Sequence, residues 1–246
     1  MADTYGVILA AGKGTRMGTP YPKVLAELHG KPLIRYVIER MQKSGIDHIV
    51  VVVGHQADLV KKSITDAGLK VLFAEQTEQL GTGHAVQAAL GVIPHDTRTL
   101  LVTYGDMPFT SPSLFAGLVE KRERLGAAVV FSTVFFDDPM GPAFGRVKRD
   151  VEGKVERIIE QKMCTEEELK IKECNAGPVA YDAVWVRTAL PNVPLNKNGE
   201  YYLTDLVEIA RAEGKLIDTV TITDPGHAHG VNTQTHLQEA HEIAAL

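Results

Sequence analysis

The chain has 246 residues, of which 44% are hydrophobic, enough to bury the core of one large α/β domain or two small ones. Its formal net charge of −5 argues against a nucleic-acid partner, so any anion site must be a local cluster of cations. No apolar run approaches the roughly 20 residues that span a bilayer, and no signal peptide is evident, so we expect no membrane partner. The spacing of Cys164 and Cys174 fits neither a metal pair nor a disulfide framework and favours a cytoplasmic location.

Short apolar runs alternate with amphipathic segments in the first half of the chain. The runs predict strands at Val7–Ala11, Ile49–Val53, Val71–Phe73, Leu100–Tyr104 and Ala128–Val134. The segments between them have helical spacing at Leu33–Lys43, Ala57–Ala67, Gly83–Leu90 and Ser113–Leu125, the last with Ser111 or Ser113 as its N-cap. Continuous β-branched runs are typical of buried parallel strands. We therefore predict an α/β fold with a mostly parallel, Rossmann-like mixed sheet flanked by helices.

After about residue 135 the pattern changes. Apolar and polar residues alternate in Phe144–Asp150 and in Lys154–Glu160, on either side of a turn at Val151–Gly153. This predicts a small two-stranded excursion near the edge of the main sheet. The remaining expected elements are a strand at Cys174–Tyr181, a helix at Leu203–Lys215, a strand at Ile217–Ile222 and a terminal helix over 235–246. No internal repeat or linker is evident, so we expect a single domain over residues 1–246.

The glycine-rich, basic stretch "VILAAGKGTRMGTPYPKVL" (Val7–Leu25) follows the first strand. Glycines at such a place let backbone N–H groups approach phosphate oxygens. The Walker pattern does not occur, and Met17 replaces the third glycine of a dinucleotide fingerprint, which sets aside a nicotinamide-dependent oxidoreductase. From Gly12 and Gly14 alone, a simple turn and a phosphate loop are equally good interpretations.

The full pattern Leu9-Ala10-Ala11-Gly12-x-Gly14-Thr-Arg16-Met17, followed by Pro22-Lys23-Val-Leu25, resembles the signature of the sugar-1-phosphate nucleotidyltransferases. Later stretches follow in the family order: "EQLGTGHA" from Glu78, "YGDMP" from Tyr104, "FGRV" from Phe144, "IIEQK" from Ile158, "NAG" from Asn175, "GEYYLTD" from Gly199 and "GVN" from Gly230. Together they most resemble the uridylyltransferase domain of the bifunctional N-acetylglucosamine-1-phosphate uridylyltransferase/glucosamine-1-phosphate acetyltransferases. The resemblance implies a nucleotidyltransferase fold with a nucleotide-binding part at about 1–110 and a sugar-binding part at about 111–232.

The resemblance also implies a reaction: Mg²⁺-dependent transfer of a uridylyl group from UTP to N-acetylglucosamine 1-phosphate. The products would be UDP-N-acetylglucosamine, a precursor of peptidoglycan and the cell wall, and pyrophosphate. The attacking sugar phosphate is already ionised, so positioning and charge neutralisation suffice and no general base is required. By resemblance, Arg16 and Lys23 are the catalytic phosphate-binding residues, and Asp106 and Asn232 are the metal ligands. Outside this motif, an arginine or a lysine would more often be a solvated surface charge.

The remaining site residues are also implied by the resemblance. The nucleotide-binding residues would be Leu9, Ala10, Ala11, Gly12, Gly14, Gln76, Gly81, Thr82, Tyr104 and Gly105, and the sugar-binding residues Gly145, Glu160 and Asn175. The chain departs from the family where Ala176 replaces a frequent threonine, and the loop at Gly141–Gly145 is two residues longer than usual. These departures leave open a transferase of the same fold for another sugar phosphate.

A non-catalytic nucleotide-sugar sensor is a further alternative. It is disfavoured because Arg16, Lys23 and Asp106 are all present. No hexapeptide periodicity occurs, so we expect no acetyl-CoA site and no acetyl transfer. The sequence is equally compatible with a stand-alone enzyme and with an excised domain.

Overall fold

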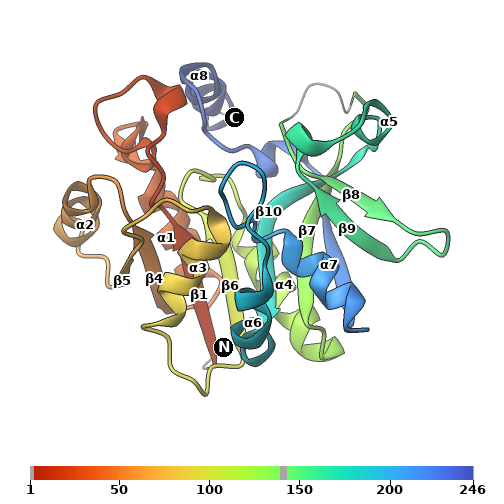
Figure 1. The fold of residues 1–246 in the computed structure, drawn as a ribbon. Coiled ribbons are helices and arrows are strands. Elements are labelled where there is room, and N and C mark those ends of the chain that lie inside the picture. Colours follow the sequence, from red (N-terminus) through yellow and green to blue (C-terminus); the bar gives the residue numbers. More distant parts are fainter. Residues whose placement is uncertain (1–2, 139–142, 246) are drawn as a thin grey trace.

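The structure, a computed structural model, describes residues 3–138 and 143–245. Its main sheet has the strand order β11-β7-β10-β6-β1-β4-β5. These strands are β1 (Thr4–Leu9), β4 (His48–Val53), β5 (Leu72–Glu75), β6 (Thr99–Tyr104), β7 (Val129–Phe135), β10 (Glu173–Asp182) and β11 (Ile217–Ile222). All neighbouring strands along this path are parallel except β10, which runs antiparallel to both β6 and β7 (Figure 1). The predicted mostly parallel mixed sheet is therefore confirmed.

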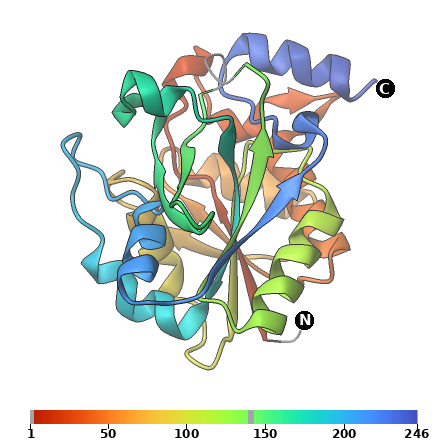
Figure 2. The same ribbon diagram turned by 90° about the vertical axis from the view of Figure 1, so that its right-hand side faces the viewer.

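Helices cover both faces of the sheet because its strands are apolar on both sides. One face packs against α1 (Leu33–Lys43), α2 (Ala57–Asp66) and α4 (Pro112–Leu125). The other face packs against α3 (Thr82–Leu90), α6 (Ala183–Ala189) and α7 (Asp205–Ala212). Figure 2 shows α6 and α7 on one side of the sheet and α4 on the other. Along β1 the alternation is direct, since Val7 and Leu9 belong to one core and Ile8 to the other.

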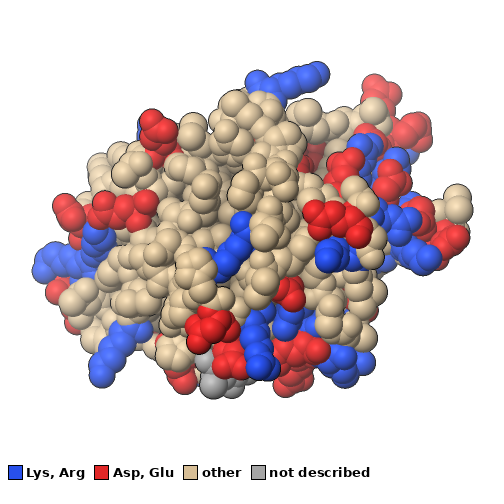
Figure 3. Space-filling model, turned by 60° about the horizontal axis from the view of Figure 1, so that its bottom comes forward, with Lys and Arg blue, Asp and Glu red and all other residues tan. Residues whose placement is uncertain are grey.

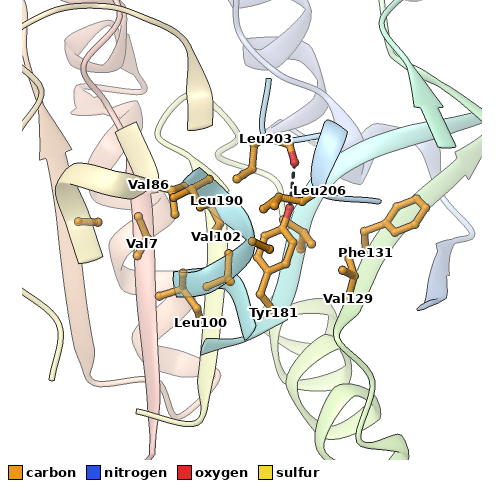
Figure 4. Packing of buried hydrophobic residues seen from close by; sticks show 14 of the residues in the cluster. Val7, Val86, Leu100, Val102, Val129, Phe131, Tyr181, Leu190, Leu203 and Leu206 are labelled. Atoms are coloured by element: carbon orange, nitrogen blue, oxygen red, sulfur yellow. Dashed lines mark hydrogen bonds between the residues drawn. The ribbon is translucent and has the colours of Figure 1, made fainter. Parts of the chain in front are cut away.

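The buried ring of Tyr181 fixes the contact between β10 and the segment that enters α7. The side chain lies among Leu100, Val102 and Leu206, and its hydroxyl donates a hydrogen bond to the Leu203 carbonyl at 3.4 Å (Figure 4). Burial raises the pKa of Tyr181 well above its ordinary value. The phenol therefore remains a neutral donor that anchors this segment.

The two-stranded excursion predicted after residue 135 is present as β8 (Arg146–Arg149) and β9 (Val155–Ile159). β8 joins the main sheet through a single register pair with β10, Arg146 opposite Cys174. The Arg146 guanidinium is fully buried and donates to the carbonyls of Phe144 and Leu169. The hairpin is thus joined to the sheet by this pairing, by the Asn175 N–H bond to the Gly145 carbonyl and by the Arg149–Glu173 ion pair. The buried Arg146 ties it to Leu169.

Several short elements were not predicted from the sequence. They are β2 (Glu27–Leu28), β3 (Lys31–Pro32), α5 (Glu166–Leu169), α6 and five 3₁₀ turns, η1 (Thr15–Met17), η2 (Lys23–Leu25), η3 (Gln161–Met163), η4 (Leu190–Asn192) and η5 (Pro225–Ala228). Among them, α5 carries a capping box between Thr165 and Glu168. That Thr-x-x-Glu signal was available in the sequence.

Several strands and helices begin or end at other residues than predicted. The strand expected at Val7–Ala11 lies at Thr4–Leu9, because the chain leaves the sheet at Ala10 to enter the glycine-rich loop. The helix expected at Leu203–Lys215 is the shorter α7, and within the described residues the terminal helix is α8 (Gln234–Ile243). Of the two N-cap candidates for α4, Ser111 is the cap, since its hydroxyl accepts from the Leu114 N–H at 3.1 Å.

Charged side chains of both signs are mixed over the surface. Figure 3 shows lysines and arginines interspersed with aspartates and glutamates around a largely uncharged centre. Many are paired, as in Arg211 with Asp150 at 2.5 Å. Among the described residues, no helix is both long and apolar enough to cross a membrane.

Candidate active site

The candidate site lies where β1 and β6 end side by side. Leu9 is opposite Tyr104 in the parallel ladder, so the loop after β1 and Asp106 after β6 start from the same edge. β10 runs the other way and therefore brings Asn175, near its beginning, to this edge as well. Open α/β sheets bind ligands at the carboxyl ends of their parallel strands.

Two adjoining cavities open at this edge. The first has a volume of about 410 Å³, and the predicted residues that line only it are Leu9, Ala10, Ala11, Gly12, Gln76, Gly81 and Thr82. The second has a volume of about 330 Å³, and the predicted residues that line only it are Arg16, Gly145, Asn175 and Asn232. Both cavities are lined by Lys23, Tyr104, Asp106 and Glu160. Of the predicted site residues, Gly14 and Gly105 are the two that line neither cavity.

The glycines differ in what their missing side chains permit. Gly14 has φ +62°, and a Cβ there would lie 2.6 Å from the Cβ of Lys23, so Gly14 lets the loop fold back on that lysine. Gly105 donates its N–H to the Leu9 carbonyl at 3.0 Å and packs closely against Ile34. A Cβ on Gly12 would meet nothing within 4 Å, although Gly12 lines the first cavity. Gly14 and Gly105 thus shape the site, whereas Gly12 leaves open space in it.

Four charged or amide side chains meet where the two cavities join. Lys23 Nζ donates to Asp106 Oδ2 at 2.6 Å and to Asn232 Oδ1 at 2.8 Å. Arg16 Nη2 donates to the same Asn232 Oδ1 at 3.1 Å. Asn232 Nδ2 is directed elsewhere, to the Gly230 carbonyl at 3.3 Å. Two oxygens from distant parts of the chain therefore converge on one cation.

This donor set fits a hard divalent cation. A carboxylate and an amide oxygen are ligands that Mg²⁺ takes in proteins, the rest of its coordination coming from water and substrate phosphates. Asp106 Oδ2 and Asn232 Oδ1 face one point, since both accept a hydrogen bond from the Lys23 ammonium. In the part of the chain that the structure describes, no group of three or more His, Cys, Asp and Glu residues could hold a metal. Within this site, Asp106 and Asn232 carry the two oxygens that would suit such an ion.

The loop at the start of α3 is fixed by hydrogen bonds within the first cavity. Gln76 is 4% exposed, and its Nε2 donates to the Gly81 carbonyl at 2.9 Å. The Thr82 hydroxyl accepts from the Leu203 N–H at 2.9 Å, which docks the "GEYYLTD" segment against the helix. His84 Nδ1 lies 2.8 Å from the Glu78 carbonyl, a contact that supports the loop.

The second cavity contains the predicted sugar-binding residues. Asn175 donates its backbone N–H to the Gly145 carbonyl at 2.8 Å, and a Cβ on Gly145 would lie 2.9 Å from Ile158 Cγ2. Ala176 is fully buried at the cavity wall. The longer loop at Gly141–Gly145 lies partly outside the described residues, and only its residues from 143 onward are described.

Burial raises the pKa values of three ionisable groups at and around Glu160. Burial raises the pKa of Glu160, which accepts a hydrogen bond from the Thr204 hydroxyl at 2.9 Å. Burial, followed by the nearby carboxylates of Glu160 and Asp106, raises the pKa of Tyr104. The pKa of Asp205 rises to about 6, first through burial and then through the charge of Glu160.

Sequence reasoning missed four polar residues that line the first cavity, namely Gln79, Lys162, Glu200 and Tyr202. Lys162 Nζ lies 5.3 Å from the centre of the Tyr202 ring and 3.8 Å from Glu200 Oε2. All four belong to motifs already singled out, "EQLGTGHA", "IIEQK" and "GEYYLTD". Their proximity depends on long-range packing that motif order does not give.

Comparison with known protein families identifies the family of this chain. Residues 6–162 match the model of the MobA-like NTP transferase domain. The chain belongs to this family. It is accordingly an enzyme of the nucleotidyltransferase class, and the predicted resemblance and enzyme class are confirmed.

Curated relatives extend the match over the whole chain. "Bifunctional protein GlmU" of Heliobacterium modesticaldum is 39% identical over 96% of this chain and 51% of its own length. The protein of the same name from Enterococcus faecalis is 38% identical over 99% of this chain and 52% of its own. The chain thus spans about half the length of the curated relatives it matches.

Solved structures show the same fold at low identity. A UDP-glucose pyrophosphorylase complexed with UDP-glucose matches with a TM-score of 0.79 and 16% identity, covering 98% of both chains. A putative glucose-1-phosphate thymidylyltransferase from Bacillus anthracis matches with a TM-score of 0.76 and 21% identity, covering 98% of this chain and 95% of that one. At these identities the likeness supports the fold alone.

Proposed function

We propose that the protein catalyses Mg²⁺-dependent uridylyl transfer from UTP to N-acetylglucosamine 1-phosphate, giving UDP-N-acetylglucosamine and pyrophosphate. The observation that carries the proposal is the convergence of Lys23, Asp106 and Asn232 where two cavities join. A transferase that joins two phosphorylated substrates needs one compartment for each and a charge-neutralising group between them. The relatives named bifunctional protein GlmU support the choice of substrates.

The first cavity suits the nucleotide. Its floor is the open backbone around Gly12, which a triphosphate can approach closely, and Arg16 and Lys23 stand at the far end of the loop. Buried Gln76 and the backbone of the α3 loop offer amide donors and acceptors that match the imide edge of uracil.

The second cavity suits the sugar phosphate. Glu160 and Asn175 provide a carboxyl and an amide to sugar hydroxyl and acetamido groups. The sugar phosphate would lie toward Asp106, where its oxygen attacks the α-phosphorus in line with the departing pyrophosphate. Tyr104 lines both cavities, so its ring would lie beside both substrates.

Catalysis in this scheme is positioning and electrostatics. A bound Mg²⁺ would supply charge neutralisation at the α-phosphate and the sugar phosphate. Arg16 binds phosphate oxygens in bidentate fashion, and Lys23, once released from Asp106 and Asn232, is a mobile positive charge for the triphosphate. No general base is needed, because the nucleophile is an ionised phosphate oxygen.

A pyrophosphate-release assay across the four common NTPs and several sugar 1-phosphates tests the proposal, with Mg²⁺ or with EDTA. We expect the highest kcat/KM for UTP with N-acetylglucosamine 1-phosphate and no turnover in EDTA. A higher kcat/KM for CTP, dTTP or glucose 1-phosphate would contradict the proposed substrates. Full activity in EDTA would contradict the metal.

A second candidate is transfer to a different sugar 1-phosphate. It is favoured by Ala176, which lines the second cavity without the hydroxyl that a threonine would supply. The same assay decides, because an Ala176→Thr variant should then move the preference toward N-acetylglucosamine 1-phosphate.

A further inference from the structure

The first turn of α8 touches both sides of the phosphate site. Gln234 bonds to the glycine-rich loop, and His236 bonds to the "GVN" segment. We propose that Gln234 and His236 are positioning residues, which hold Arg16 and Asn232 in place for the triphosphate and its metal. The kinetic part of this inference rests on the proposed function.

Gln234 fixes a loop that has little stability of its own. Arg16 lies in the single 3₁₀ turn η1, between Gly14 and Gly18, which both have left-handed φ angles of 62° and 63°. One such turn is not stable in isolation. Gln234 Nε2 donates to the Met17 carbonyl at 2.9 Å, across 217 positions of the chain. This bond ties the end of the turn that carries Arg16 to α8.

His236 fixes the main chain at Asn232. The Asn232 N–H donates to His236 Nδ1 at 3.3 Å, and the preceding Val231 N–H donates to the Asp106 carbonyl at 2.8 Å. The Asn232 side chain is oriented in turn by the bond from its Nδ2 to Gly230. With these three bonds, Asn232 Oδ1 is directed toward Lys23 and Arg16 and has little freedom to turn away.

α8 itself is seated independently of these two polar contacts. Thr233 caps it by accepting from the His236 N–H at 3.2 Å. The buried side chains of Ala240 and Val231 belong to one apolar cluster with Met17 and Leu33. Because this cluster holds both α8 and the Met17 side chain, loss of one polar contact should loosen the main chain of the loop or Asn232 locally without unfolding α8.

Removal of each contact has a distinct expected effect. Gln234→Met keeps the length of the side chain and removes the donor. KM for the nucleoside triphosphate should therefore rise about tenfold with a smaller fall in kcat, which is the scale of losing one hydrogen bond that positions a binding group. His236→Phe removes the acceptor, so apparent Mg²⁺ affinity should fall about tenfold, as for other groups that orient metal ligands. His236→Asn, whose Oδ1 can replace Nδ1, should restore most of that affinity.

The matched control is Gln238→Met. Gln238 lies one turn further along α8, is exposed, and has no partner among the contacts of the described residues. Hydrogen exchange on the substrate-free protein gives a readout that does not depend on activity. The amides of Met17 and Gly18, which bond to Gly14 and Thr15, should exchange faster in Gln234→Met than in wild type and in Gln238→Met.

The two parts of the experiment fail separately. If wild type releases no pyrophosphate with any NTP, the proposed function is wrong, and hydrogen exchange still tests the anchoring. If Gln234→Met matches Gln238→Met in both exchange and KM, the positioning role of Gln234 is overturned. If His236→Asn is as impaired in Mg²⁺ affinity as His236→Phe, the role assigned to Nδ1 is overturned.

Discussion

Lys23 Nζ lies 2.6 Å from Asp106 Oδ2, with the Asp106 side chain only 10% exposed. Without substrates, the lysine expected to bind phosphate neutralises the carboxylate expected to bind metal. Under the proposed function, substrate binding would separate this pair, with Mg²⁺ binding Asp106 and the triphosphate binding Lys23. The buried carboxylate is compensated before the metal arrives.

Asp106→Asn is expected to lower kcat by about 10²-fold or more, the scale of removing one preorganised electrostatic group. The amide keeps the shape of the side chain but lacks the charge that a divalent cation requires. Steady-state pyrophosphate release at saturating Mg²⁺ measures the effect. Asp66→Asn, which alters an exposed pair with Lys62, is the control. Near-normal turnover of Asp106→Asn would remove Asp106 from the metal site.

Gly12→Ala should affect nucleotide binding alone, whereas Gly14→Ala should also lower the thermal stability. A methyl group on Gly12 enters open space beside the first cavity, so Tm should be unchanged while KM for the nucleotide rises about tenfold. A methyl group on Gly14 collides with Lys23 at a left-handed φ, so Tm should fall as well, by the roughly 2–4 °C that 1 kcal/mol corresponds to in a chain of this size. Thermal melts and nucleotide titrations distinguish the two. Equal melting temperatures would contradict the assignment.

Gln76→Ala should weaken the choice of base more than the affinity for phosphate. The side chain fixes the Gly81 carbonyl within the loop that would read the base, and loss of one such hydrogen bond corresponds to about tenfold. The measurement is kcat/KM for UTP relative to CTP, with pyrophosphate inhibition as the measure of phosphate affinity. If inhibition by pyrophosphate weakens as much as the base preference, the residue acts on the loop as a whole.

Asp205 should make the protein less stable as the pH rises. Burial and the charge of Glu160 raise its pKa from 3.8 to about 6, so between these values the folded state binds more protons than the unfolded state. The free energy of unfolding therefore falls as pH increases through this window. Asp205→Asn should raise Tm by roughly 2–4 °C at about pH 8 and leave it unchanged at about pH 4. A carboxylate in the first turn of α7 has a favourable helix-dipole contribution, and a lower Tm at about pH 8 would show that this contribution dominates.

Much of the fold follows from local patterns, because the buried strands are continuous apolar runs and each parallel connection needs a helix. Thus β4 was predicted at nearly its true limits from a β-branched run. The antiparallel direction of β10 and the short helix α6 were not predicted, since both depend on packing with distant segments. The order of the motifs predicted which residues belong to the site. It did not predict that Lys23 pairs with Asp106, because the two are 83 positions apart and meet only through the pairing of β1 with β6. Gln234 and His236 gave no local signal at all.

The antiparallel strand β10 brings a second stretch of the chain to the site, so the two cavities are lined largely by different segments. The lining of the first cavity comes mainly from β1, the glycine-rich loop and the start of α3, whereas the second draws on the stretch from residue 143 to 177. That stretch joins the remainder of the sheet through β10, with β8 attached by a single register pair. Glu160 and Lys162 of the same stretch also line the first cavity. A chimaera that exchanges residues 143–177 with those of another family member should therefore change which sugar phosphate is accepted, and any change in nucleotide preference should trace to these two positions.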